Sequence, residues 1–271
     1  MTVRIVVLLK YVPDITSDRR FTDGRVVRDP AEGSLNELDE NAVEAALRIV
    51  EALPEPAEGE DPHEVVAVTV APEAADIAVR KAYQIGVGRG IRVTDEALAG
   101  SDYFGTTAAL AAAVRRLGED QPVDLVVTGM AALDGLGSVV PALLAEELGW
   151  PQLTLATSVS LEDRTLTITR EADDAVETLA APLPAVLSVT DSANSPRYPN
   201  FTLIMAARTK PIEVWTAADL ELDPAEVGLA GARTTTVDAA PRPPRGELQL
   251  VVDKGEGGTA LAQFLITNDL V

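Results

Sequence analysis

The chain has 271 residues, with 22 Lys plus Arg against 43 Asp plus Glu, which gives a formal charge of −21 and an isoelectric point near 4.3. This charge argues against nucleic acid as a partner, because phosphate backbones are bound by clustered Lys and Arg. The sequence has no cysteine and one histidine, which excludes disulfides, thiolate nucleophiles and cysteine-held zinc or iron–sulfur clusters.

Membrane and targeting signals are also missing from the pattern. No stretch approaches the ~20 apolar residues that a membrane-spanning helix needs. The apolar run near the N-terminus is short and ends at Lys10, unlike a secretory signal peptide. We therefore expect a cytoplasmic protein without membrane insertion.

The first 150 residues alternate between strand and helix patterns. Continuous β-branched and leucine runs predict buried parallel strands, and stripes with helical spacing predict the helices between them. Asn36 and Ser138 are the predicted N-caps of the first and last of these helices. The strands are predicted at 4–10, 64–70, 91–94 and 124–128, and the helices at 38–52, 73–85, 103–117 and 138–148. This alternation predicts an α/β, Rossmann-like fold with a mainly parallel sheet and helices on both faces.

The pattern changes after residue 151. Segments 153–161, 164–170 and 175–180 alternate apolar and polar residues, with acidic pairs between them, which predicts an added antiparallel meander. A buried strand at 185–190, an irregular segment at 192–201 and a short helix at 202–208 follow.

The last forty residues form a separate region. Residues 232–247 are rich in Thr and Pro and predict an extended linker, followed by a strand-like stretch at 248–252 and a helical stripe at 259–268. So short a segment cannot bury its own apolar face. It must pack on its own domain or on another chain, and its length past a linker favours the second. We therefore divide the chain into a nucleotide-binding α/β domain (1–231) and a C-terminal arm (232–271) that is expected to pack on another chain.

Three segments are expected to meet at the carboxyl edge of the sheet, where open α/β sheets bind ligands. The most informative is GMAALDGLGS (129–138), which has three glycines and runs directly into a helix. We call residues 129–140 the glycine loop. Free backbone N–H groups and the helix dipole suit a phosphate there. An ordinary strand-to-helix turn explains the same glycines equally well, and the pattern is neither GxGxxG nor a Walker motif.

A run of acidic residues, SLNELDENAVEAA (34–46), opens the first helix. On spacing alone, capping and dipole compensation are the better explanation. A metal site is a poor alternative, because no histidine or further acidic cluster has matching spacing.

In this order, the segments closely resemble the β subunit of electron transfer flavoproteins from the first strand to about residue 215. The resemblance rests on VVLLKYVPD (6–14), SLNELDENAVEAALRI (34–49), VVAVTVAP (65–72), KAYQIGVGRGIRV (81–93) and DLVVTGMAALDGLGSVVPALLAEELGWPQLT (124–154). It continues through ITREADDAVETLAAPLPAVLSV (168–189) and NSPRYPNFTLIMAARTKPIEV (194–214).

The resemblance implies a subunit of a heterodimeric electron carrier. In that family an α subunit supplies most of an FAD site, and the β subunit supplies one wall and binds its own nucleotide. That nucleotide is usually a structural AMP, or a second FAD in electron-bifurcating members. Electrons pass from dehydrogenases, such as acyl-CoA dehydrogenases, to a membrane quinone reductase. Such a carrier needs no catalytic residues of its own, since the chemistry belongs to the cofactor.

By position, the resemblance implies a set of nucleotide contacts. Ile15 and Leu38 fall near the FAD of the α subunit. Compared with the family pattern, the glycine loop lacks several side-chain hydrogen-bond donors, because Met130, Leu136 and Val139 occupy their positions. The other implied contacts are Leu8, Asn36, Glu37, Asp39, Val70, Gly129, Asp134, Gly135, Gly137, Ser138, Val139 and Val140.

The segment SANSPRYPNF (192–201) aligns with the family's recognition loop for partner dehydrogenases, and we call residues 190–201 the docking loop. The family's large aliphatic anchor is replaced by Ala193, which implies a different partner or weaker anchoring. The implied recognition residues are Ala193, Asn194, Pro196, Arg197, Tyr198 and, from the turn near 171, Glu171.

Two other classes of function remain to be weighed. One is a stand-alone adenine-nucleotide-binding module with a regulatory role, since the same fold hosts such proteins. A lone module would have no need for an apolar arm. The other is a hydrolase or transferase, which the lack of a nucleophile–base pair or metal cluster disfavours.

Overall fold

We describe a computed structural model that covers residues 2–17, 20–22, 25–29, 31–240, 243 and 250–271. The chain divides into a first unit, residues 1–238, and a second unit, residues 239–271. The first unit includes Arg233 and Thr234, whose backbone N–H groups both donate to the Asp102 carboxylate at 2.8 Å.

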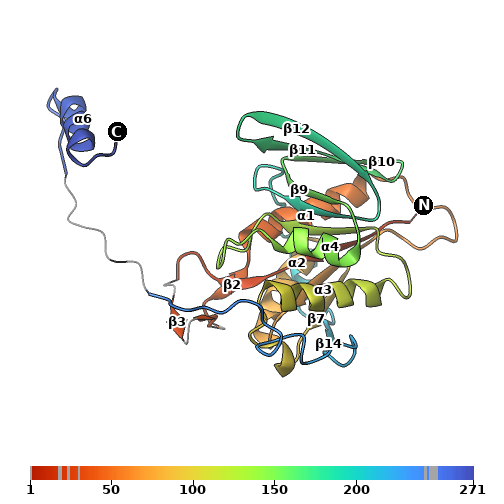
Figure 1. Ribbon diagram of the computed structural model, residues 1–271. Helices are drawn as coiled ribbons and strands as arrows, with labels where there is room; N and C mark the ends of the chain where they lie inside the picture. The colour runs from red at the N-terminus through yellow and green to blue at the C-terminus, as the bar shows by residue number, and fades with distance from the viewer. Residues whose placement is uncertain (1, 18–19, 23–24, 30, 241–242, 244–249) are drawn as a thin grey trace. The chain divides into compact units, whose positions relative to one another are not determined.

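A seven-stranded parallel sheet forms the centre of the first unit, in the order β14-β7-β6-β1-β8-β13-β9 (Figure 1). Its inner strands are buried along most of their length, as expected of Val- and Leu-rich strands between two helical layers. The strands are β1 (Arg4–Leu8), β6 (Glu64–Val70), β7 (Arg89–Val93), β8 (Leu125–Gly129), β9 (Gln152–Ala156), β13 (Ala185–Val189) and β14 (Glu213–Trp215).

Helices cover both faces of this sheet, which confirms the predicted α/β class. Two separate apolar clusters lie on its two faces: α1 and α2 belong to one, and α3 and α4 to the other. Short 3-10 helices at Glu73–Ala75 and Glu96–Leu98 complete the connections. The helices of this unit are α1 (Glu37–Ala52), α2 (Asp76–Ile85), α3 (Tyr103–Leu117), α4 (Val140–Leu148) and α5 (Phe201–Ala207).

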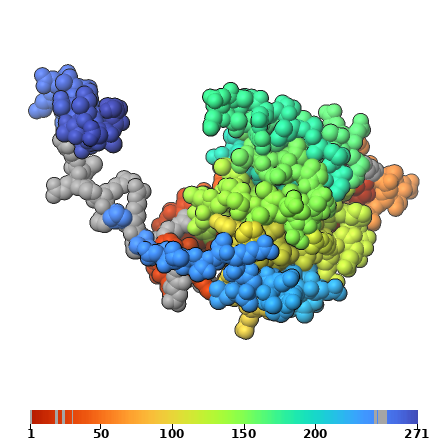
Figure 2. Space-filling model, viewed as in Figure 1, coloured from red at the N-terminus to blue at the C-terminus, as the bar shows by residue number. Residues whose placement is uncertain are grey.

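The predicted meander is a separate antiparallel sheet of β10 (Ser158–Glu162), β11 (Thr165–Ala172) and β12 (Ala175–Pro182). Its residues form a green layer along the upper side of the first unit in Figure 2. Leu166 and Ile168 of β11 are buried in the same apolar cluster as α1. This contact places the antiparallel sheet on the α1 side of the molecule.

The prediction of one strand over 153–161 was wrong. The chain leaves the parallel sheet after Ala156, and β10 begins at Ser158 in the antiparallel sheet. Between them, the N–H of Thr157 donates to the carbonyl of Thr169 at 2.7 Å. Both halves alternate apolar and polar residues, so the pattern does not mark where the pairing strand changes.

Two short antiparallel strand pairs between β1 and α1 were not anticipated. They pair β2 (Tyr11–Pro13) with β5 (Gly33–Leu35), and β3 (Phe21–Thr22) with β4 (Arg25–Val26). The first of the parallel strands also ends earlier than predicted, at Leu8. The shorter strand leaves Lys10 in the turn at the carboxyl end of β1.

The second unit contains α6 (Gly257–Thr267), none of whose residues is buried. In the predicted strand-like stretch, residues 250–252 form no strand, and 248–249 lie outside the described residues. Among the residues that the structure describes, no helix is both long and apolar enough to cross a bilayer.

Candidate functional site

The carboxyl ends of β6, β1 and β8 lie side by side, because these strands are neighbours in the sheet. They bring Leu8, Val70 and Gly129 to one edge, beside the start of α1. Leu8 is buried and Val70 is half-buried. A Cβ added at Gly129 would lie 2.6 Å from the Leu38 carbonyl oxygen and 2.7 Å from Asp39 Oδ1, so this contact between strand and helix requires glycine.

Asn36 joins the start of α1 to the glycine loop. Its Nδ2 donates to the carbonyl of Ala131 at 2.9 Å, and its Oδ1 accepts from the N–H of Leu133 at 3.0 Å. The residue occupies the predicted N-cap position, but its side chain makes no capping bond to the helix backbone. The predicted N-cap position is confirmed, while the side-chain amide bonds to the glycine loop and to Asp39 instead of to the helix backbone.

Asp39 is buried beneath the same edge. It accepts the backbone N–H of Lys10 at 2.7 Å and Asn36 Nδ2 at 2.9 Å. Burial raises the pKa of Asp39 to about 7, and the hydrogen bonds from Asn36 and Lys10 only partly oppose that rise. Asp39 thus holds the turn after β1 against α1, and its charge changes near neutral pH.

Asp134 lies in the glycine loop but is not free for a ligand. Lys10 Nζ donates to Oδ1 at 2.8 Å, Arg28 Nε donates to Oδ2 at 2.9 Å, and the Asp134 side chain is 1% exposed. Burial alone would raise the pKa of Asp134, but the two cations bring it below its usual value. The contacts of Lys10 and Arg28 with Asp134 were not predicted from the sequence. The position of Lys10 directly after a strand could have indicated a role at this edge, whereas no sequence feature marked Arg28.

The end of the glycine loop offers backbone donors. Among the described residues, the N–H groups of 137–140 have no acceptor, and the helix hydrogen bonds begin with Leu143 to Val139. Leu136 (φ 48°) and Ser138 (φ 53°) adopt left-handed conformations that cost about 1–3 kcal/mol each in ordinary residues. Ser138 was predicted to be the N-cap of α4, but Val139 holds that position without a side-chain bond. Consecutive free amides at a helix start suit an anion such as a nucleotide phosphate.

Further support for a ligand at this edge comes from β6. The hydroxyl of Thr69, next to Val70, is the one buried side-chain polar atom within the described residues that lacks a hydrogen-bond partner. Such groups are rare in folded proteins unless water or a ligand satisfies them. The other predicted contacts are more exposed: Ile15 is 56% exposed, Leu38 is half-buried and Glu37 is exposed. The free backbone N–H groups of residues 137–140 fit a nucleotide phosphate. The side chains of Ile15 and Leu38 fit the apolar wall of a ligand site.

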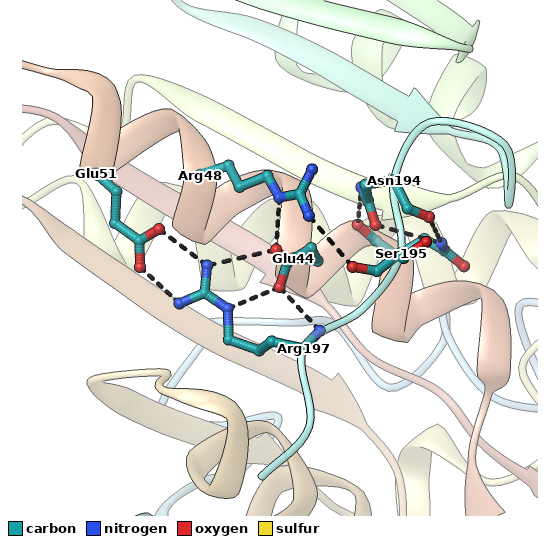
Figure 3. A network of polar contacts seen from close by, with 7 residues as sticks. Glu44, Arg48, Glu51, Asn194, Ser195 and Arg197 are labelled. Atoms are coloured by element: carbon teal, nitrogen blue, oxygen red, sulfur yellow. Dashed lines mark hydrogen bonds and ion pairs between the residues drawn. The ribbon is translucent and has the colours of Figure 1, made fainter. Parts of the chain in front are cut away.

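The docking loop follows β13 and is tied to α1 (Figure 3). Asn41 Nδ2 donates to the Asn194 carbonyl at 2.9 Å, and Asn194 Nδ2 donates back to the Asn41 carbonyl at 3.0 Å. Arg48 reaches the Ser195 carbonyl at 3.3 Å. These bonds fix the first half of the loop against the helix.

Arg197 makes the strongest part of this attachment. Its guanidinium donates to Glu44 at 2.7 Å and to both oxygens of Glu51, at 2.6 and 2.9 Å (Figure 3). Burial alone would raise the pKa of Glu44, but hydrogen bonds from Arg197 and Arg48 bring it below its usual value. Arg197 was predicted to face a partner, but its guanidinium forms ion pairs with acidic residues of the same chain. Glu44 and Glu51 were missed because their pattern is that of an ordinary helix surface.

The other predicted recognition residues have different surroundings. Ala193 is half-buried and packs against the apolar core, and Pro196 is half-buried. Tyr198 is 95% exposed and Phe201, which begins α5, is 77% exposed. Glu171 lies outside the loop, in β11, opposite Val176 of β12. The docking loop therefore presents the aromatic side chains of Tyr198 and Phe201 to solvent, while the small side chain of Ala193 packs inward.

No cluster of three or more metal-ligating side chains occurs within the described residues. The described buried and ion-paired groups instead organise the two loops, from positions spread along α1. The residues at its start hold the glycine loop, and those farther along hold the docking loop.

The comparisons with known proteins agree with one another on a single family. Residues 23–220 match the model of the electron transfer flavoprotein domain family. Electron transfer flavoprotein subunit beta of Mycobacterium tuberculosis is 42% identical over 98% of this chain and 99% of that protein, and the Mycobacterium leprae protein of the same name is 40% identical over the same shares. Subunit CarD of the caffeyl-CoA reductase-Etf complex of Acetobacterium woodii is 30% identical over 92% of this chain and 91% of its own length.

Proposed function

The chain belongs to the electron transfer flavoprotein family, among its β subunits, and from this premise we propose that it forms a heterodimer with an α subunit and carries electrons through a shared FAD. The observation that carries the proposal is the match along 98% of the chain to proteins named as β subunits. The relatives are electron-transfer subunits, which is consistent with a carrier that makes and breaks no substrate bonds itself.

The nucleotide of the β subunit is proposed to be AMP. Its phosphate would accept hydrogen bonds from the free N–H groups of residues 137–140 at the start of α4. Its adenine would lie toward Leu8 and Val70 at the strand ends. Asn36 and Asp39 act indirectly, because their side chains fix the loop and the turn rather than point free donors at a ligand.

The shared FAD is proposed to lie against Ile15 and Leu38. Their aliphatic side chains exclude water from one side of the flavin without stacking on it. When bound, the flavin supplies the redox chemistry by accepting and releasing electrons. This chain contributes the wall and the dry environment, while most of the flavin contacts come from the α subunit.

We assign the binding of partner proteins to the docking loop. We propose that residues 190–201 bind dehydrogenases, such as acyl-CoA dehydrogenases, and that electrons then pass to a membrane quinone reductase from a cytoplasmic carrier. The rigid attachment to α1 lowers the entropy cost of presenting Tyr198, with Asn194, Pro196 and Arg197 in the same loop. Glu171 is proposed to assist from the nearby meander. The arm (232–271) is proposed to pack on the α subunit.

Co-expression with an α subunit tests the carrier proposal. We expect a yellow complex, and heat release followed by chromatography should give one FAD and one AMP per heterodimer. Two FAD per heterodimer would instead support an electron-bifurcating carrier. A colourless, stable monomer that forms no flavin complex with any α subunit would contradict the carrier proposal, and if it bound AMP it would favour the regulatory module.

A further inference from the structure

The glycine loop rests on a side chain that lies outside it. Tyr103 is the first residue of α3, and its ring lies against the last glycine of the loop. A Cβ added at Gly137 would be 2.2 Å from Tyr103 Oη and 2.5 Å from Cζ, and one at Gly135 would be 3.5 Å from Oη. The space that a side chain would take at Gly137 is therefore filled by the tyrosine.

Tyr103 itself is held in place by the residue before it. Asp102 caps α3, accepting the N–H groups of Phe104 at 2.9 Å and Gly105 at 3.1 Å. Its second oxygen accepts the N–H groups of Arg233 and Thr234. The first turn of α3 is thus fixed from two sides, and the ring is presented to the loop from a rigid support.

The loop has little other support at this point. The N–H groups of Gly135 and Leu136 donate to the Ala132 carbonyl at 3.2 and 2.7 Å, but among the described residues Gly137 and Ser138 make no hydrogen bond. The left-handed conformations of Leu136 and Ser138 flank Gly137 on both sides. Residues in such sparsely populated conformations stay there only when their surroundings hold them.

We propose that Tyr103 is a positioning residue for the nucleotide phosphate: its ring fixes Gly137 and so aims the N–H groups of residues 137–140. This inference rests on the proposed function, since it requires an adenine nucleotide at the glycine loop. The hydroxyl has no hydrogen-bond partner among the described residues, so the ring surface performs this role.

A double-mutant cycle tests the contact in the purified heterodimer. AMP affinity would be measured by calorimetry after removal of bound nucleotide, for Tyr103→Ala, Gly137→Ala and the double variant. We expect Tyr103→Ala to weaken AMP binding at least threefold and Gly137→Ala at least tenfold. The double variant should bind AMP more tightly than Gly137→Ala, because the new methyl group enters the space that the ring has left. Tyr103→Phe should bind like the wild type.

Two control measurements separate positioning from folding. FAD content and thermal midpoint should stay near wild-type values in Tyr103→Ala, since Tyr103 is 38% exposed. Wild-type AMP affinity in Tyr103→Ala, or an equal penalty for Gly137→Ala with and without the tyrosine, would overturn the inference and leave the proposed function intact. A wild-type heterodimer that binds no AMP would overturn the proposed AMP site together with the inference.

Discussion

At the scale of single residues, charge and backbone conformation determine what the proposed ligand edge can bind. Ser138 combines a positive φ with an exposed side chain and a free N–H group. Asp39, near the start of α1, is a buried carboxyl whose pKa is about 7. One residue faces the proposed phosphate and the other supports the edge, so substitutions at the two positions are expected to act differently.

Ser138 allows a test of the phosphate site by charge alone. Asp and Asn both tolerate left-handed backbone conformations, and they have nearly the same shape. We expect Ser138→Asp to weaken AMP binding by about tenfold or more, because a negative charge near the phosphate repels it. Ser138→Asn is the matched neutral control. Equal AMP affinities for the two variants, measured by calorimetry, would exclude a phosphate beside this residue.

Asp39 predicts a pH dependence of stability. Its folded pKa, about 7, lies above the ordinary value of 3.8, so the folded state favours the protonated acid. The free energy of unfolding should therefore fall as the pH rises from about 4 to 7, by up to about 1.4 kcal/mol per pH unit from this group. Above pH 7 the contribution becomes constant.

The check is a comparison of urea unfolding for the wild type and Asp39→Asn between pH 5 and 8. The stability of the wild type relative to the variant should decrease as the pH rises toward 7. A difference that does not change with pH would show that Asp39 titrates at its ordinary pKa. The isosteric amide keeps an acceptor for Lys10, so the variant is expected to fold.

At the scale of elements, α1 is the common support of both candidate sites. Its start holds the glycine loop through Asn36, and the helix farther along holds the docking loop through Glu44 and Glu51. These last two acids bind the same guanidinium, but the Glu44 side chain is 4% exposed and that of Glu51 is 54% exposed. Because Glu44 and Glu51 bind the same guanidinium but differ in burial, substitutions at the two positions compare a buried ion pair with an exposed one.

Replacing each acid by its amide should therefore give unequal losses of stability. We expect Glu44→Gln to lower the free energy of unfolding by about 2 kcal/mol, since it removes a buried charge that accepts from both Arg197 and Arg48. Glu51→Gln should cost less than about 1 kcal/mol, because water screens an exposed pair. Chemical denaturation measures both, and equal losses would contradict a buried role for Glu44.

At the scale of the whole molecule, the second unit contains no buried residue among those that the structure describes. None of the residues of α6 is buried, although Leu261, Phe264 and Ile266 are large and apolar. Apolar helices of this kind are stabilised by packing against another surface. This composition supports the proposal that the arm binds the α subunit.

Phe264→Asp tests that proposal. Burial of a phenylalanine side chain contributes about 1.5–3 kcal/mol, so its loss should weaken association with the α subunit by about tenfold to a hundredfold. Gln263→Asp, on the same helix, adds the same charge at a polar position and should leave association nearly unchanged. Analytical ultracentrifugation or surface-based binding measures both. Equal effects of the two variants would exclude Phe264 from the interface.

The sequence by itself determined the α/β class, because a buried parallel strand needs a continuous apolar run and an amphipathic helix needs a 3.6-residue period. It also predicted that the ends of the strands and the glycine loop meet at one edge of the sheet, since strand ends and glycines are local features. The helix at Tyr103–Leu117 was predicted with the bounds that the structure shows.

Only the tertiary structure decided what the polar side chains do. Asn36 is the N-cap of α1 as predicted, but its side chain bridges to a loop 95 residues away. Ser138 was also predicted to be a cap, yet it offers a free N–H group instead. Lys10, Arg28 and Tyr103 support the glycine loop from elsewhere in the chain. Such partners are set by the packing of distant elements, and hydrogen bonds between distant segments leave no periodic signal in the sequence.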